Sequence, residues 1–159
     1  MSRWDSPTYY GENTTIRNCF FYAMAYGVQL DYSWNGFIEN NYFQACTTAA
    51  IHNPSVYGEP DYFTIRNNVF TSNAADINLP DCARELIEGN RFIDATLAIV
   101  ILNGDYNTIH DNTIQGDPTG TNNMINLTGG SITNLVSNNM LSCTIAQYDT
   151  TCSDAGSGS

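Results

Sequence analysis

The phrase that decides the fold is IRNNVF, residues 65–70, because it recurs along the chain with small changes. Each copy begins with Ile or Val and ends in an aromatic or large aliphatic residue, and successive copies begin 22 or 27 residues apart. The six copies are IRNCFF (16–21), IENNYF (38–43), IRNNVF (65–70), IEGNRF (87–92), IHDNTI (109–114) and VSNNML (136–141). A repeat of this length is typical of a solenoid, in which each repeat packs on its neighbours.

A second apolar phrase follows each of the first five copies. Its copies are GVQL (27–30), AIHN (50–53), DINL (76–79), AIVI (98–101) and MINL (124–127). The short segments of each repeat have a period of two residues, which favours strands over helices. Since one repeat cannot bury its own apolar residues, the sequence predicts an all-β parallel solenoid of about six 22-residue coils. The first Ile and the last residue of each copy should form inward columns, with coils about 4.8 Å apart.

The fourth position of the phrase holds an amide in five of the six copies. Asn tolerates unusual backbone angles, and its side chain can both donate and accept hydrogen bonds. We therefore predict an interior ladder of Asn side chains at a tight turn, made by Cys19, Asn41, Asn68, Asn90, Asn112 and Asn139.

On the period, the phrase and the Asn column, the chain resembles the right-handed parallel β-helix (pectin-lyase-like) superfamily. That group includes pectate lyases, polygalacturonases and the spikes of tailed bacteriophages. The resemblance covers residues 14–148. It implies three sheets per coil: the second phrase forms sheet one, and the I-x-N-N-x-F phrase forms sheet two, the Asn turn and sheet three. Fold alone does not assign a function.

Three segments are expected. Residues 1–13 would be an N-terminal cap or contact segment, residues 14–148 the β-helix, and residues 149–159 a flexible polar tail. The two 27-residue intervals place their extra length in loops 53–62 and 115–123, on the outside of the solenoid where binding residues are often found.

Composition excludes several classes of protein. The chain of 159 residues carries 16 acidic and 5 basic side chains, a net charge of −11, and no lysine. A nucleic-acid partner is excluded because phosphate neutralisation needs clustered basic residues. The sequence has neither the apolar run needed for membrane insertion nor the apolar core of a secretion signal.

The five cysteines are widely spaced, and only two histidines accompany them. This pattern predicts no metal site and no cofactor. Reduced thiols are expected, with a bridge between Cys143 and Cys152 as the main exception.

The outward positions of the coils hold few candidates for catalytic groups. Glu39 and Glu88 flank Arg66 in the aligned coils, which favours a surface charge ladder over a pair of catalytic acids. The outer face of sheet one, the glycan groove that the resemblance implies, is expected to hold Gln29, Ile51 or His52, Asn78, Val100 and Asn126, with Asp76 as the nearest carboxylate. Paired carboxylates are missing there, so no catalytic residue is assigned and the inclination is towards a protein that is not an enzyme.

Binding residues are expected in the loops and among the exposed aromatics: Trp34, Tyr57, Glu59, Asp61, Tyr62 and Asp117. A second set of apolar residues should point outward from sheets two and three, where burial would require a neighbouring subunit. These interface candidates are Phe20, Phe37, Tyr42, Val69, Leu86, Leu135 and Met140.

The prediction from these observations is a structural component of a bacteriophage particle, resembling tailspike or capsid decoration proteins. It would act as a rigid homotrimer in the virion, bound to a capsid or tail protein and in contact with surface polysaccharide. The alternative is a carbohydrate-active enzyme, a lyase or hydrolase, or a glycan-binding module, located outside the cell.

Overall fold

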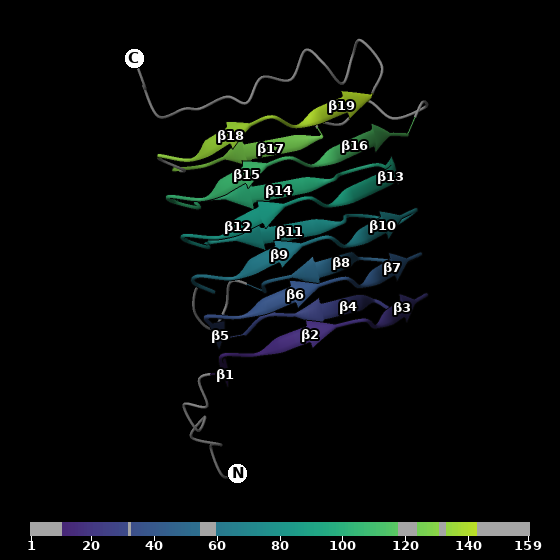
Figure 1. Ribbon diagram of the computed structural model, residues 1–159, viewed down its shortest axis with the longest axis horizontal. Coiled ribbons are helices and arrows are strands. Elements are labelled where there is room, and N and C mark those ends of the chain that lie inside the picture. Colours follow the sequence, from purple (N-terminus) through teal and green to yellow (C-terminus); the bar gives the residue numbers. More distant parts are fainter. Residues whose placement is uncertain (1–10, 32, 55–59, 118–123, 131–132, 143–159) are drawn as a thin grey trace, which may run out of the picture.

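The chain folds as a parallel β-helix, in which the strands of successive coils lie side by side from β1 to β19 (Figure 1). The computed structural model describes residues 11–31, 33–54, 60–117, 124–130 and 133–142, and within these ranges all regular structure is β-strand. Three parallel sheets run along the solenoid. A short fourth ladder begins with β1 (Gly11–Glu12) paired to β5 (Ser33–Trp34) and continues as single bridges from Trp34 through Asp61 and Ala83 to Asp105.

Sheets two and three have six strands each, and sheet one has five. Sheet two comprises β2 (Thr15–Arg17), β6 (Phe37–Glu39), β9 (Thr64–Arg66), β12 (Leu86–Glu88), β15 (Thr108–His110) and β18 (Leu135–Ser137). Sheet three comprises β3 (Phe20–Tyr22), β7 (Tyr42–Gln44), β10 (Val69–Thr71), β13 (Arg91–Ala95), β16 (Thr113–Gly116) and β19 (Met140–Ser142). Sheet one comprises β4 (Tyr26–Gln29), β8 (Ala49–His52), β11 (Ile77–Pro80), β14 (Ile99–Leu102) and β17 (Ile125–Thr128).

The core consists of the predicted columns. The first Ile of each phrase pairs in register with the first Ile of the next coil, from Ile16 through Ile38 and onward to Val136. On sheet three, the aromatic rings stack nearly parallel, with centroid distances of 4.7 Å for Phe21–Phe43, 5.1 Å for Phe43–Phe70 and 4.8 Å for Phe70–Phe92. In-register stacking buries each ring between its neighbours, which fixes the alignment of the coils.

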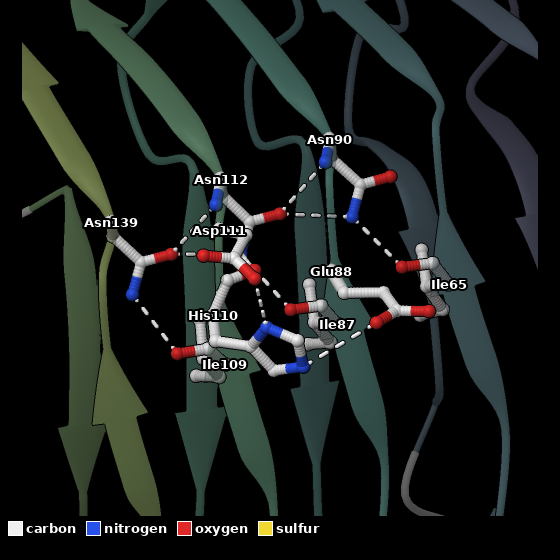
Figure 2. A network of polar contacts seen from close by, with 9 residues as sticks. All are labelled: Ile65, Ile87, Glu88, Asn90, Ile109, His110, Asp111, Asn112 and Asn139. Atoms are coloured by element: carbon white, nitrogen blue, oxygen red, sulfur yellow. Dashed lines mark hydrogen bonds and ion pairs between the residues drawn. The ribbon is translucent and has the colours of Figure 1, made fainter.

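The Asn ladder forms as predicted (Figure 2). The side-chain amide of Asn68 donates to Asn90 Oδ1 at 3.1 Å and to the Ile38 carbonyl at 2.7 Å, while its Oδ1 accepts the backbone N–H of Asn41 at 2.9 Å. The same arrangement repeats through Asn112 and Asn139. Each amide thereby links three coils inside the buried core, where an unpaired polar group would be costly.

Each residue of the Asn ladder directly follows a residue with positive φ. A second corner of the coil also carries a positive-φ residue in every repeat. The Asn corner is the turn between sheets two and three. Its positive-φ residues are Asn18, Asn40, Asn67, Gly89, Asp111 and Asn138. The Tyr corner is the turn that leads into sheet two. Its positive-φ residues are Asn13, Asn35, Tyr62, Arg84, Tyr106 and Thr133.

A second, mixed ladder lies inside the Tyr corner and was not predicted. Asn107 donates from Nδ2 to Asn134 Oδ1 at 3.0 Å, and the Glu85 backbone N–H donates to Asn107 Oδ1 at 2.8 Å. One coil earlier, Glu85 Oε2 accepts the Phe63 backbone N–H at 2.8 Å. The next place belongs to Gly36, and a Cβ there would clash with the Phe63 ring. The Phe63 side chain therefore fills the space that Gly36 leaves.

The parallel β-helix, its three sheets and the Asn ladder are confirmed. The coil number is slightly lower than predicted, because the sixth coil contributes strands to sheets two and three but none to sheet one in the described residues. Asp76, expected as the carboxylate nearest to the outer face of sheet one, does not reach that face. Its side chain turns inward and is 1% exposed. Half of loop 53–62, most of loop 115–123, most of segment 1–13 and the whole of tail 149–159 lie outside the described residues.

Candidate functional site

The first coils present an exposed group of aromatic rings on sheet three, here named the first-coil aromatic cluster: Phe20, Tyr22 and Tyr42. Phe20 and Tyr22 are 62% and 60% exposed, although both belong to a regular strand. The Phe20 ring lies 5.5 Å from the Tyr42 ring and 5.9 Å from the Tyr22 ring, measured between centroids. Contiguous exposed rings on a flat sheet are typical of a contact surface.

The other interface candidates are spread over the length of the solenoid. Phe37, Leu135 and Met140 are exposed, whereas Val69 and Leu86 are half-buried. On sheet three, Arg91 and Thr113 lie in register between Val69 and Met140 and interrupt the apolar stripe. On sheets two and three, the exposed apolar side chains are therefore concentrated toward the two ends of the solenoid, and the aromatic ones lie in the first coils.

A second exposed feature, here named the Tyr–Arg column, consists of Tyr62, Arg84 and Tyr106 at the Tyr corner. The Arg84 guanidinium carbon lies 5.3 Å from the Tyr62 ring centroid and 5.7 Å from that of Tyr106. Arg84 also reaches Asp61, with 3.8 Å between Nη1 and Oδ2. The two tyrosines are 52% and 51% exposed, so both rings remain accessible on a rigid turn.

This column carries backbone strain. A bulky residue at positive φ is an outlier in the left-handed region, where Asn, Asp and Gly are favoured. Such a residue costs of order 1–3 kcal/mol, whereas an exposed cation–π contact contributes only about 0.5–1 kcal/mol. Two such contacts do not offset three strained residues. The same corner uses Asn13 and Asn35 in the first two coils. The stacked column is therefore retained in spite of its local cost.

The predicted binding residues come together only in part. Trp34 is half-buried and bridges through its backbone to Asp61, directly beside the column. Tyr62 belongs to the column itself. Asp117 is half-buried on another part of the coil, where its backbone N–H donates to the Ala95 carbonyl at 2.9 Å. Tyr57 and Glu59 lie outside the described residues.

Two carboxyl groups are buried inside the solenoid. Burial raises the pKa of Asp76 to about 8, and the hydrogen bond from Asn73 Nδ2 at 2.8 Å only partly opposes this. Burial also raises the pKa of Glu85, against the hydrogen bond from the Phe63 N–H, and the negative charge of Asp61 raises it further. Asp76 Oδ2 and Glu85 Oε1 have no hydrogen-bond partner among the described residues. Both groups are therefore favoured in the protonated, neutral form.

At the rim of the Tyr corner, Asp61 is the third carboxyl with an altered environment. Burial raises its pKa, and the Arg84 guanidinium opposes that shift. Its Oδ1 atom is buried and has no hydrogen-bond partner in the described part of the chain. Asp61 and Arg84 thus form a partly shielded ion pair beneath the two tyrosine rings.

Charged side chains on sheet two form pairs between coils. Arg66 donates from Nε and Nη2 to Glu39 Oε2 at 2.9 and 2.8 Å. Glu88 pairs instead with His110, at 3.4 Å between Oε2 and Nε2, and the other ring nitrogen of His110 lies 2.7 Å from Asp111 Oδ2 (Figure 2). This agrees with a surface charge ladder, because each Glu lies within ion-pair distance of a basic side chain in a neighbouring coil.

The outer face of sheet one has the expected row. Register pairs Gln29 with His52, His52 with Asn78, and Asn78 with Val100, which pairs with Asn126. The sequence allows either Ile51 or His52 in this row. The structure places His52 in it, and Ile51 is buried. The Tyr26 ring stacks on His52 at 4.8 Å. The row thus offers amides and one imidazole, whose Nδ1 atom lies 3.3 Å from the Asn78 carbonyl oxygen.

Metal-ligating residues are dispersed. No group of three or more His, Cys, Asp or Glu residues in the described ranges is placed to hold a metal ion. His52 lies on sheet one and His110 on sheet two, while Cys46 and Cys82 are buried cysteines and Cys19 is an exposed one. Cys143 and Cys152 lie outside the described residues. Within that described part, no helix is long and apolar enough to cross a membrane.

The fold and its ladders define the class: a parallel β-helix protein built of 22-residue coils with an interior Asn ladder. The chain belongs to the NosD family, whose model, described as "Periplasmic copper-binding protein (NosD)", matches residues 5–154. No curated protein and no solved structure matches the chain.

Sequence reasoning missed Arg84, Tyr106 and Glu85. Arg84 and Tyr106 each lie five residues before the Asn corner residue of the same coil, as do Asn13, Asn35 and Tyr62. That five-residue spacing was present in the sequence and would have aligned the column. The strain itself had no sequence signal, because only the backbone angles distinguish a Tyr at positive φ from a Tyr in an ordinary loop.

Proposed function

We propose that this protein is a rigid structural component that binds other protein chains through its first-coil aromatic cluster. The observation that carries the proposal is the exposure of Phe20, Tyr22 and Tyr42 on a regular strand surface. A soluble monomer rarely leaves contiguous rings of this kind in water, and aromatic residues are enriched in the buried centres of protein interfaces.

The scaffold suits a mechanical role. Adjacent coils are joined by backbone pairing in three sheets, by a stacked Phe column and by two internal side-chain ladders. The contacts are therefore distributed evenly along the solenoid axis, as in other repeat architectures. Such a unit can hold a docking surface at a fixed position without any moving part.

The finer proposal is that three copies associate side by side, and that the trimer is a tailspike-like or decoration component of a bacteriophage particle, bound to a capsid or tail protein. This part draws its support from the resemblance to spike proteins and from the exposed aromatic surface. We place the protein in the virion on the same grounds. An extracellular or periplasmic location would instead fit the alternative functions.

Copper binding, the property in the family's description, requires a different arrangement of residues. Copper ions are held by converging imidazole, thiolate and thioether groups. Here His110 is engaged by Glu88 and Asp111, His52 stacks on Tyr26, and the buried thiol Cys82 lies 3.8 Å from Asn107 Oδ1. These donors lie on different sheets and do not converge in the described residues, so no copper-dependent step is proposed.

The mass of the full chain in solution tests the proposal. Light scattering after size-exclusion chromatography is expected to give three times the 17.5 kDa chain mass. A Phe20→Ser/Tyr42→Ser double variant should be monomeric with unchanged far-UV circular dichroism. Tyr106→Ser, which removes an equally exposed ring on another corner, is the matched control and should remain trimeric. A monomeric wild type would contradict the aromatic interface.

The location of the protein is tested separately. Antibody labelling of purified virus particles should place the protein on capsids or tails, and its recovery from periplasmic extract would favour the family's described location. Incubation with polysaccharides should release no oligosaccharide. Release of shortened chains would instead support the carbohydrate-active enzyme.

A further inference from the structure

We propose that the Tyr–Arg column is a binding site for neutral glycans, with Tyr62 and Tyr106 as stacking surfaces and Arg84 as the hydrogen-bond donor between them. This site lies on the Tyr corner, whereas the first-coil aromatic cluster lies on sheet three. The proposal is therefore independent of the assembly proposed above.

The first argument is the strain at this corner. Tyr62, Arg84 and Tyr106 adopt positive φ in three consecutive coils, and the two preceding coils place Asn at the same position. Asn would relieve the strain at no cost to the turn, as it does at four of the six positions of the Asn corner. Strained residues persist where the surrounding structure holds them and where their side chains have a role, and they cluster at ligand sites.

The second argument is geometry. Tyr62 and Tyr106 lie two coils apart, about 9.6 Å by the ordinary strand spacing, and both are about half exposed. The guanidinium of Arg84 lies between them, and the Arg84 side chain is 46% exposed. The column is anchored to backbone that pairs in both directions through the bridges of Asp61, Ala83 and Asp105. Rigid aromatic residues contact a ligand with little loss of conformational entropy.

The third argument concerns ligand charge. Arg84 is already paired with Asp61, so the column offers no unbalanced positive charge. The chain as a whole carries a net charge of −11, which repels polyanions. Tyrosine faces and a paired guanidinium suit a polyhydroxylated, uncharged ligand, whose C–H faces stack on the rings and whose oxygens accept N–H groups. Uronate-rich chains and phosphorylated polymers are disfavoured on the same grounds.

A glycan array carrying neutral and uronate-containing oligosaccharides tests the proposal with the labelled full-length protein. The wild type is expected to bind neutral oligosaccharides. Tyr106→Ala and Tyr62→Ala should each lower the apparent affinity for the best neutral oligosaccharide at least tenfold. Tyr26→Ala, which removes a 37% exposed ring from sheet one, outside both the column and the first-coil aromatic cluster, is the matched control and should bind as the wild type does.

A further variant separates binding from folding. Tyr62→Asn/Tyr106→Asn replaces both rings with the residue that the turn prefers, and it should abolish binding while the melting temperature stays equal or rises. The proposal is overturned if the wild type binds no neutral oligosaccharide, if it binds only uronate-containing ones, or if the tyrosine variants bind unchanged. None of these results would bear on trimer formation, which is measured without a glycan.

Discussion

The Asn corner and the Tyr corner are the same turn built from different residues. Both place a positive-φ residue outside and a ladder residue inside, and they lie five residues apart in each coil. At the Asn corner, the outward residues are Asn, Asp or Gly, and five of the six inward residues are Asn in a closed ladder. At the Tyr corner, bulky outward residues are strained and the inward ladder contains Gly36, Phe63 and Glu85.

The two corners differ in how well their residues suit the turn. The Asn corner satisfies its backbone and its side chains together, which is the consistency expected of a sequence that specifies a single structure. The Tyr corner departs from that consistency on both its outer and its inner side. Departures of this kind are expected at functional sites. The following predictions test whether the two corners differ in this way, from the largest effect to the smallest.

Breaking the Asn ladder should have the largest effect. Asn68→Ala removes the acceptor of the Asn41 backbone N–H and the donors to Asn90 and to the Ile38 carbonyl. Because the site is buried, the free energy of unfolding should fall by about 3–5 kcal/mol, as measured by urea denaturation. Asn78→Ala, which truncates an outward amide on sheet one, should cost less than about 1 kcal/mol. Equal losses would mean that the ladder adds nothing beyond an ordinary surface amide.

The buried carboxyl of the Tyr corner should make stability depend on pH. The pKa of Glu85 is raised in the folded protein above the value of about 4.3 in an unfolded chain. Its contribution is therefore fully present below pH about 4 and is lost as pH rises toward the folded pKa. Glu85→Gln keeps the acceptor for the Phe63 N–H and cannot ionise. The variant should be more stable than the wild type by on the order of 2 kcal/mol at pH 8, with the difference vanishing near pH 4.

Asp76 provides the comparison for that measurement, because it lies away from both corners. Its pKa of about 8 exceeds the unfolded value of about 3.9, so its contribution is lost between pH about 4 and pH 8. Asp76→Asn should therefore remove a second, separate part of the dependence of the unfolding free energy on pH. A wild-type stability that does not change between pH 4 and pH 8 would contradict the assignment of both groups as neutral.

The glycine in the Tyr corner ladder should be sensitive to size. In Gly36→Ala, the new methyl group would meet the Phe63 ring, and overpacking of this kind costs about 1–3 kcal/mol. Thermal unfolding should show the loss, and Phe63→Leu in the same chain should recover part of it by vacating the space. If the double variant is no more stable than Gly36→Ala, the loss arises from the backbone and not from the ring.

The difference between the corners also explains what the sequence could predict. The Asn corner repeats one residue type at one spacing, so its phrase was sufficient to predict the coils, the Ile and Phe columns and the ladder. The Tyr corner keeps the same spacing but varies from Asn35 to Tyr62 to Arg84, so no single residue type repeats in every coil to reveal the column. The inward position of Asp76 likewise had no repeated pattern to predict it. This residue directly precedes β11 (Ile77–Pro80), where the chain is still turning and a carboxyl can point inward.

The smallest effect, and the one that separates the corners most directly, is expected from Tyr106→Asn. The substitution relieves a bulky residue at positive φ, a strain of order 1–3 kcal/mol, and it removes one cation–π contact with Arg84 of about 0.5–1 kcal/mol. The balance should raise the free energy of unfolding by about 0.5–1 kcal/mol in urea denaturation. The reciprocal change at the Asn corner, Asn67→Tyr, installs the same strain without a stacking partner and should lower stability by about 1–2 kcal/mol. If Tyr106→Asn raises the free energy of unfolding and Asn67→Tyr lowers it, the fold prefers Asn at both corners. The tyrosine at position 106 would then be kept for what it binds, because the turn is more stable without it.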